Sequence, residues 1–77
     1  MNQENDVKLQ AIFRLLFENV DNITQLKQLS EPAWDSLATT TLIAAIESEF
    51  NILMNIDDME RMTSYGAVRL LMEAKGL

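Results

Sequence analysis

At 77 residues, with 48% hydrophobic residues and a formal net charge of −6, the chain has the length and composition of one folded domain, residues 1–77. It contains neither histidine nor cysteine, which excludes imidazole and thiolate metal ligands, Ser-His or Cys-His nucleophile pairs and a disulfide framework. Because it has only two glycines, a glycine-rich phosphate loop is also excluded, and we expect neither an enzyme nor a metal site.

The first predicted element is an amphipathic helix over roughly residues 5–18. Its apolar side chains recur at helical spacing and form one stripe, which a helix would bury against the rest of the domain. The stripe consists of Leu9, Ile12, Phe13, Leu16 and Val20.

A long ordered loop is predicted for residues 21–35, with room for one helical turn. Pro32 prevents a continuous helix here, and we expect Ile23, Leu26 and Leu29 to fix the loop to the core. Trp34 is expected to plug the end of the loop against the helices, since a buried tryptophan contributes a large apolar area. Loops of this length in small domains tend to be functional, which draws attention to the residues that follow.

A second helix is predicted from Ser36 to Phe50. One face carries apolar residues at helical spacing, although the β-branched run at residues 39–41 is slightly unfavourable for a helix. Packing must therefore hold this helix more than propensity does. The face consists of Thr39, Leu42, Ile43, Ile46 and Phe50.

The last third of the chain predicts a short helix and then a longer one. Asp57 is expected to be the N-cap of the short helix, with Glu60 at its third position, and the helix should end near Met62. Thr63 or Ser64 should cap the last helix, which Gly76 should stop. The last helix should bury Tyr65, Val68, Met72 and, at the edge of its stripe, Leu71.

The predicted fold class is therefore all-α. Three main helices and one short helix, with a long loop between the first two, should form a small four-helix bundle of the up-and-down type, without a sheet. No apolar run approaches the roughly 18 residues of a membrane span, and the polar, acidic start of the chain differs from a secretory signal. We expect a cytoplasmic monomer that does not insert into membranes.

Negative charge is concentrated in the middle of the chain. The 33 residues from 28 to 60 contain no Lys or Arg, so we expect a field that steers basic partner surfaces and repels nucleic acid, rather than an ordinary solvated face. The seven acidic residues of this segment are Glu31, Asp35, Glu47, Glu49, Asp57, Asp58 and Glu60.

Ser36 stands at the predicted start of the second helix, directly after the long loop. The first turn of a helix offers free backbone N–H groups and the positive end of the helix dipole, which suit a phosphate ester on this hydroxyl. The simpler interpretation is that Ser36 or Asp35 is only an N-cap. Leu37 lies away from the apolar stripe of its helix, so we expect it to be available as a docking contact.

The sequence Asp35-Ser36-Leu37, followed by a helix that ends Ile46-Glu47-Ser48-Glu49-Phe50, resembles the acyl carrier proteins of fatty acid, polyketide and related biosynthesis. The resemblance covers nearly the whole chain. It implies that a phosphopantetheinyl transferase moves 4′-phosphopantetheine from coenzyme A to Ser36, and that the thiol of this covalent cofactor then carries an acyl group as a thioester. It also implies that Asp35 and Leu37 flank the attachment site.

The same resemblance implies contacts with acyl- or aminoacyl-loading and acyl-transferring enzymes along the second helix. The expected partner-binding residues are Leu37, Thr41, Ala44, Glu47 and Glu49. Helix periodicity places Glu47 closer to Leu37 around the helix than it places Glu49, so we expect Glu47 to matter more.

Two alternatives to a standard acyl carrier follow from the same residues. The family's typical second helix has an acid and a larger apolar docking residue where this chain has Ala38, Thr41 and Ala44, which indicates a specialised pathway. The segment Asn51-Ile52-Leu53 is similar to the D-alanyl carrier proteins, whose cargo is an amino acid. The alternative from another class is a small helical interaction adaptor, in which Ser36 only caps a helix.

Overall fold

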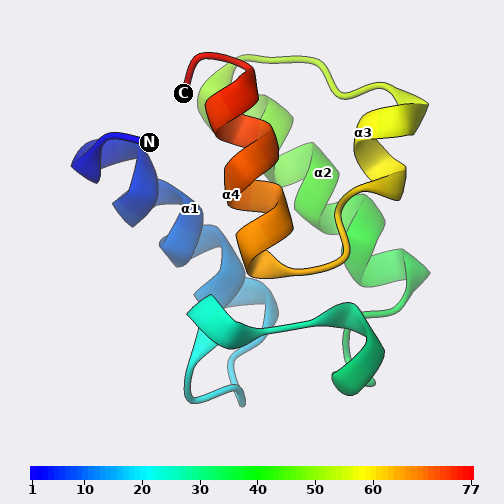
Figure 1. Ribbon diagram of the computed structural model, residues 1–77. Coiled ribbons are helices and arrows are strands. Elements are labelled where there is room, and N and C mark those ends of the chain that lie inside the picture. The colour runs from blue at the N-terminus through cyan, green and yellow to red at the C-terminus, as the bar shows by residue number, and fades with distance from the viewer.

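The computed structural model describes residues 1–77 and confirms a small all-α bundle with three main helices and one short helix (Figure 1). The loop between the first two main helices contains two short 3₁₀ turns instead of the single turn expected. There is no strand, only an isolated antiparallel bridge between Lys27 and Ser64. The elements in chain order are α1 (Gln3–Leu16), η1 (Ile23–Gln25), η2 (Gln28–Ser30), α2 (Ser36–Phe50), α3 (Ile56–Glu60) and α4 (Tyr65–Ala74).

The main helices do not alternate strictly up and down. In Figure 1, α1 runs downward, whereas α2 and α4 both run upward. The connection between α2 and α4, which contains α3, returns the chain to the lower end of the bundle, so α4 can run in the same direction as α2. None of the helices has the length and apolar character required to cross a lipid bilayer.

The ends of α1 and α2 follow from their capping residues. Asn2 caps α1 by accepting a hydrogen bond from the backbone N–H of Asn5, which explains why this helix starts earlier than periodicity alone predicts. It ends before Phe17, whose backbone leaves the helical region while its ring enters the core. The predicted range of α2 is confirmed, and Asn51 ends it in the left-handed conformation, with φ of 54°.

The predicted cap of α3 is wrong by two residues. Asn55, not Asp57, is the N-cap, and Asp58, not Glu60, completes the capping box at the third helical position. The side chain of Asn55 accepts from the Asp58 N–H at 2.8 Å, and the Asp58 carboxylate accepts from the Asn55 N–H at 3.0 Å. Both positions carry good capping residues, and the earlier one is favoured because it satisfies a donor at each side of the box.

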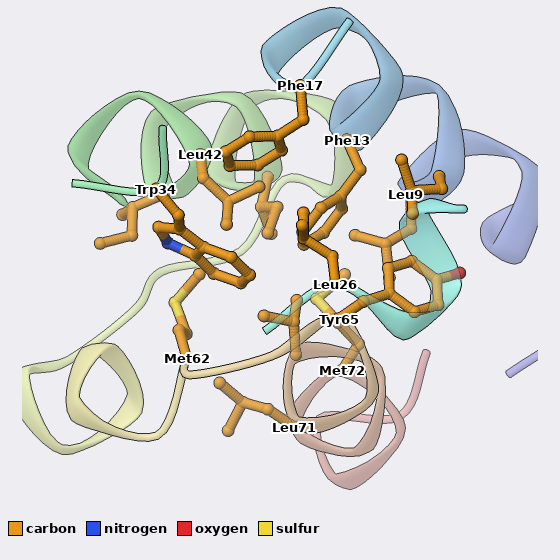
Figure 2. Packing of buried hydrophobic residues seen from close by; sticks show 14 of the residues in the cluster. Leu9, Phe13, Phe17, Leu26, Trp34, Leu42, Met62, Tyr65, Leu71 and Met72 are labelled. Carbon is orange, nitrogen blue, oxygen red and sulfur yellow. The ribbon is translucent and has the colours of Figure 1, made fainter. Parts of the chain in front are cut away.

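The core lies between the three main helices and the long loop (Figure 2). All the buried side chains predicted for α4 are found there. The stripes predicted for the first two helices are buried only in part: Leu9, Phe13, Leu42, Ile43 and Ile46 are in the core, whereas Ile12, Leu16, Val20, Thr39 and Phe50 are half-buried at its edge. Ile23 and Leu26 are buried as expected. Leu29 is wrongly predicted: it lies in η2, none of whose residues is buried, and it is fully exposed. The 15 clustered side chains are Leu9, Phe13, Phe17, Ile23, Leu26, Trp34, Leu42, Ile43, Ile46, Met54, Met62, Tyr65, Val68, Leu71 and Met72.

Tyr65 joins the first and last helices at the edge of this core. Its ring meets Phe13 edge-on, with centroids 5.0 Å apart, and its hydroxyl donates to Asp6 Oδ1 at 3.0 Å. Burial, and then the neighbouring Asp6 carboxylate, raise the pKa of Tyr65 to about 12. The phenol is therefore neutral at physiological pH and keeps its hydrogen bond to α1.

Candidate functional site

Trp34 fixes the end of the long loop directly before Asp35 and Ser36. It is only 2% exposed, and its ring packs edge-on against Phe13 at 5.7 Å and tilted against Phe17 at 5.4 Å (Figure 2). Its indole Nε1 donates to Thr39 Oγ1 at 2.9 Å. The expected plug is confirmed, and it also ties the loop to the first turns of α2.

Asp35 is the N-cap of α2, and this removes the capping role from Ser36. The Asp35 carboxylate accepts from the backbone N–H of Ala38 at 2.9 Å, and its carbonyl accepts from the N–H and the hydroxyl of Thr39 at 3.0 and 3.1 Å. Ser36 is therefore the first residue inside the helix. The interpretation of Ser36 as a helix cap is wrong, because Asp35 already satisfies the donor that a cap would serve.

Ser36 presents an uncommitted hydroxyl at this helix start. The residue is exposed, and its side chain makes no hydrogen bond to any other group of the protein. The backbone N–H groups of Ser36 and Leu37 have no acceptor in the protein either, as expected in the first turn of a helix. A phosphate ester on Ser36 would thus lie beside free donors at the positive end of α2.

The threonine run that follows donates its hydroxyls to carbonyl groups of the first turn of α2. Thr40 Oγ1 donates to the Ser36 carbonyl at 2.9 Å, and Thr41 Oγ1 donates to the Leu37 carbonyl at 3.0 Å. The hydroxyls of these β-branched residues are thereby satisfied within the helix. The threonine hydroxyls therefore occupy the carbonyl groups of Ser36 and Leu37, whereas the N–H groups of the same two residues stay free.

The other serines differ from Ser36 in position or in partners. Ser64 Oγ caps α4 by accepting from Ala67 at 2.9 Å, and Ser30 Oγ donates to the Lys27 carbonyl at 3.4 Å. Ser48 is exposed without a side-chain partner, but it lies near the C-terminal end of α2, away from the free N–H groups. Ser36 alone combines a free hydroxyl with a helix N-terminus.

Leu37 begins the exposed face of α2. Its side chain is 75% exposed, which confirms that the core does not use it, and Thr41 and Ala44 are also exposed on the same face at helical spacing. Glu49 is exposed and makes no hydrogen bond or ion pair. The face next to Ser36 is therefore one apolar side chain followed by small or hydroxylated residues.

Glu47 differs from the expectation of a free steering charge. It is half-buried, and its Oε2 accepts from the backbone N–H of Met54 at 2.9 Å, across the connection to α3. This hydrogen bond holds the connection in place, so one oxygen of the Glu47 carboxylate serves the fold and is not free to contact a partner. The expected order, Glu47 before Glu49, is not supported by this geometry.

The acidic segment is largely uncompensated by bases. Asp58 alone among its acids forms an ion pair, with Lys75. The Glu31 carboxylate accepts from the backbone N–H of Ala33 at 3.1 Å, and the Asp35 carboxylate caps α2, so hydrogen bonds fix both side chains. No group of three or more acidic side chains is arranged to hold a metal ion.

Three exposed apolar residues near α3 were missed by the sequence patterns. Leu53 and Ile56 are 85% and 73% exposed, and Met59 is also exposed. Periodicity could not find them, because a five-residue helix and its preceding loop are too short to define an apolar stripe. Their only signal is the apolar run around residues 52–56 at a position where no long helix can form.

No family model, curated protein or solved structure matches this chain.

Proposed function

We propose that this chain is an acyl carrier protein, with 4′-phosphopantetheine attached to the hydroxyl of Ser36. One observation carries the proposal: the exposed hydroxyl of Ser36 is free of protein partners at the first position of a helix that Asp35 caps and Trp34 fixes. An attachment point has to be accessible to a large enzyme and fixed in position. Ser36 meets both requirements.

The attachment chemistry needs no catalytic group from this chain. In the proposed reaction, Ser36 Oγ attacks the phosphorus that bears pantetheine in coenzyme A, the pyrophosphate bond breaks, and adenosine 3′,5′-bisphosphate leaves. The phosphopantetheinyl transferase accepts the serine proton. The chain supplies a positioned hydroxyl and the two free N–H groups beside it, and the thiol arrives with the cofactor. The absence of His and Cys is compatible with this function.

The exposed face of α2 supports docking of the partner enzymes. An apolar contact at Leu37 beside the attachment point, with Glu49 farther along the helix, gives an anchor and a steering charge. Thr41 and Ala44 between them leave a low surface against which a partner can lie close. Acyl- or aminoacyl-loading and acyl-transferring enzymes of a lipid or related biosynthetic pathway are the partners we propose.

The attachment test uses purified protein, coenzyme A and a phosphopantetheinyl transferase of broad specificity. We expect intact-mass spectrometry to show the gain of one phosphopantetheine, located on Ser36 by peptide mapping. Ser36→Ala should abolish the gain, whereas Ser48→Ala, the matched change of an exposed serine on the same helix, should retain it. No gain on the natural chain, or a gain that persists in Ser36→Ala, would favour the interaction adaptor.

The cargo is tested on the modified protein. Incubation with ATP and either a fatty acid with an acyl-loading enzyme or D-alanine with an aminoacyl-loading enzyme separates the two carrier types by mass. We propose the acyl cargo, because Asn51, which begins the segment similar to D-alanyl carriers, already has a structural role as the left-handed end of α2. Exclusive loading of D-alanine would assign the chain to the aminoacyl carriers instead.

A further inference from the structure

Helix α3 is attached to the bundle in a different way from the other helices. It has five residues, and Asp58, at 7% exposure, is its only buried residue. Its two apolar side chains, Ile56 and Met59, are both exposed to solvent. The helix is therefore not held down by apolar packing of its own residues, as α1, α2 and α4 are.

Asp58 makes the contact that α3 otherwise lacks. Its Oδ2 accepts from Lys75 Nζ at 2.8 Å and also from the backbone N–H of Asn55 at 3.0 Å. One carboxylate oxygen thus closes the capping box of α3 and joins α3 to the C-terminal end of α4, where Lys75 is the capping residue. The Lys75 hydrogen bond, followed by that from Asn55, lowers the pKa of Asp58, so the pair is charged at neutral pH.

Two buried methionines hold the chain on either side of α3. Met54, 8% exposed, directly precedes the N-cap, and Met62, 1% exposed, directly follows the last residue of the C-terminal cap, Arg61. Because the chain is held in the core at Met54 and Met62, the segment between them can move while the main helices stay packed. Methionine side chains are flexible and adapt to altered surroundings at low cost, which suits residues at the ends of a moving segment.

We propose that α3 opens independently of the three main helices, and that the Asp58–Lys75 ion pair is the latch that keeps it closed. Apart from Met54 and Met62, which flank α3, the core residues come from α1, α2, α4 and the loop between α1 and α2, so most of the core can persist when α3 opens. Local opening of such a unit occurs at a lower free energy than global unfolding. The inference does not depend on the proposed carrier function, because its readout needs neither cofactor nor partner.

Amide hydrogen exchange of the unmodified protein tests the latch. The reporters are the N–H groups of Met59 and Arg61, which donate to the carbonyls of Asn55 and Asp58 at 3.1 Å each, compared with amides in the middle of α2. In Lys75→Met we expect α3 exchange to accelerate on the order of tenfold or more, with α2 changed much less. Lys75→Arg, which keeps the charge, should stay closer to the natural chain.

Two further variants keep the test decisive. Lys8→Met removes the exposed pair with Glu4 at 3.5 Å within α1 and should leave α3 exchange unchanged. Asp58→Asn keeps an acceptor for the capping box while removing the ion pair, and it should accelerate α3 exchange as Lys75→Met does. Equal acceleration of α2 and α3, or no acceleration in either latch variant, would overturn the proposal.

Methionine oxidation gives a second readout in the same proteins. With dilute peroxide, the sulfurs of Met54 and Met62 should react faster in Lys75→Met than in the natural chain, because opening of α3 moves the adjoining chain and gives peroxide intermittent access to these two side chains. Met72, fully buried in α4, should stay protected and serves as the internal reference. Faster oxidation of Met72 to the same degree would indicate global loosening and contradict an independent α3.

Discussion

Replacing Leu37 with alanine should separate docking from stability. The side chain is 75% exposed, so only about a quarter of the roughly 1.5–3 kcal/mol gained by complete burial of a leucine is at stake. The expected loss of stability is about 0.5 kcal/mol, which lowers the melting temperature of a domain of this size by about 2–4 °C. Leu42→Ala is the matched control on the same helix: this leucine is 0% exposed, and its loss should cost about 2–5 kcal/mol.

The functional loss at Leu37 should be larger than the structural one. Removal of a docking anchor typically costs about 1–2 kcal/mol of binding free energy. At tenfold per about 1.4 kcal/mol, this predicts that kcat/KM for phosphopantetheine transfer to Ser36 falls by about fivefold to thirtyfold. The assay measures transfer from coenzyme A by mass spectrometry, and the rate is normalised to the folded fraction from thermal melts. If Leu37→Ala is as unstable as Leu42→Ala, or if its normalised rate equals that of the natural chain, the docking role is refuted.

Four other changes test the site and the fold. Asp35→Asn keeps an equally good N-cap, so a slower transfer to Ser36 without loss of thermal stability would show that the Asp35 charge itself assists attachment. Ser36→Ala should change stability by less than about 0.5 kcal/mol in denaturant titration, since its hydroxyl makes no hydrogen bond; a larger loss would reveal an unrecognised structural role. The fold raises the pKa of Tyr65 from 10.0 to about 12, so its contribution is complete below pH 10 and is lost as the pH rises through 12, and Tyr65→Phe should flatten the stability profile in this window. Glu49→Lys should slow docking most at low salt, and the melting temperature of the natural chain should rise between low and physiological ionic strength; a salt-independent effect in either experiment would contradict the electrostatic interpretation.

Local signals were sufficient to predict much of this fold. The range of α2 could be predicted because Asp35 and Asn51 are strong start and stop residues and the buried stripe between them is regular. The cap of α3 could not, because Asn55 and Asp57 are both good capping residues and only the reciprocal bonds with Asp58 distinguish them.

Tertiary pairings account for what sequence reasoning missed at the site. The position of Glu47 on α2 predicts a free charge, but the connection to α3 folds back and brings the Met54 N–H to its carboxylate. The sequence places Asp58 in the acidic segment, which contains no base, but its partner, Lys75, lies at the C-terminal end of another helix, and no local pattern joins the two. The exposure of Ser36 and Leu37 could be anticipated, since it depends only on the start and the stripe of one helix.

The position of Trp34 gives the protein a built-in optical reporter. It is the only tryptophan in the chain, so all indole fluorescence comes from one ring, buried against Phe13 and Phe17 and hydrogen-bonded to Thr39. Indole emission shifts to longer wavelength when the ring is transferred from an apolar environment to water, and this ring lies two residues before Ser36. Emission can therefore follow, without any label, both the melting of the domain and any change in the packing of the loop when the proposed partner enzymes bind at Ser36.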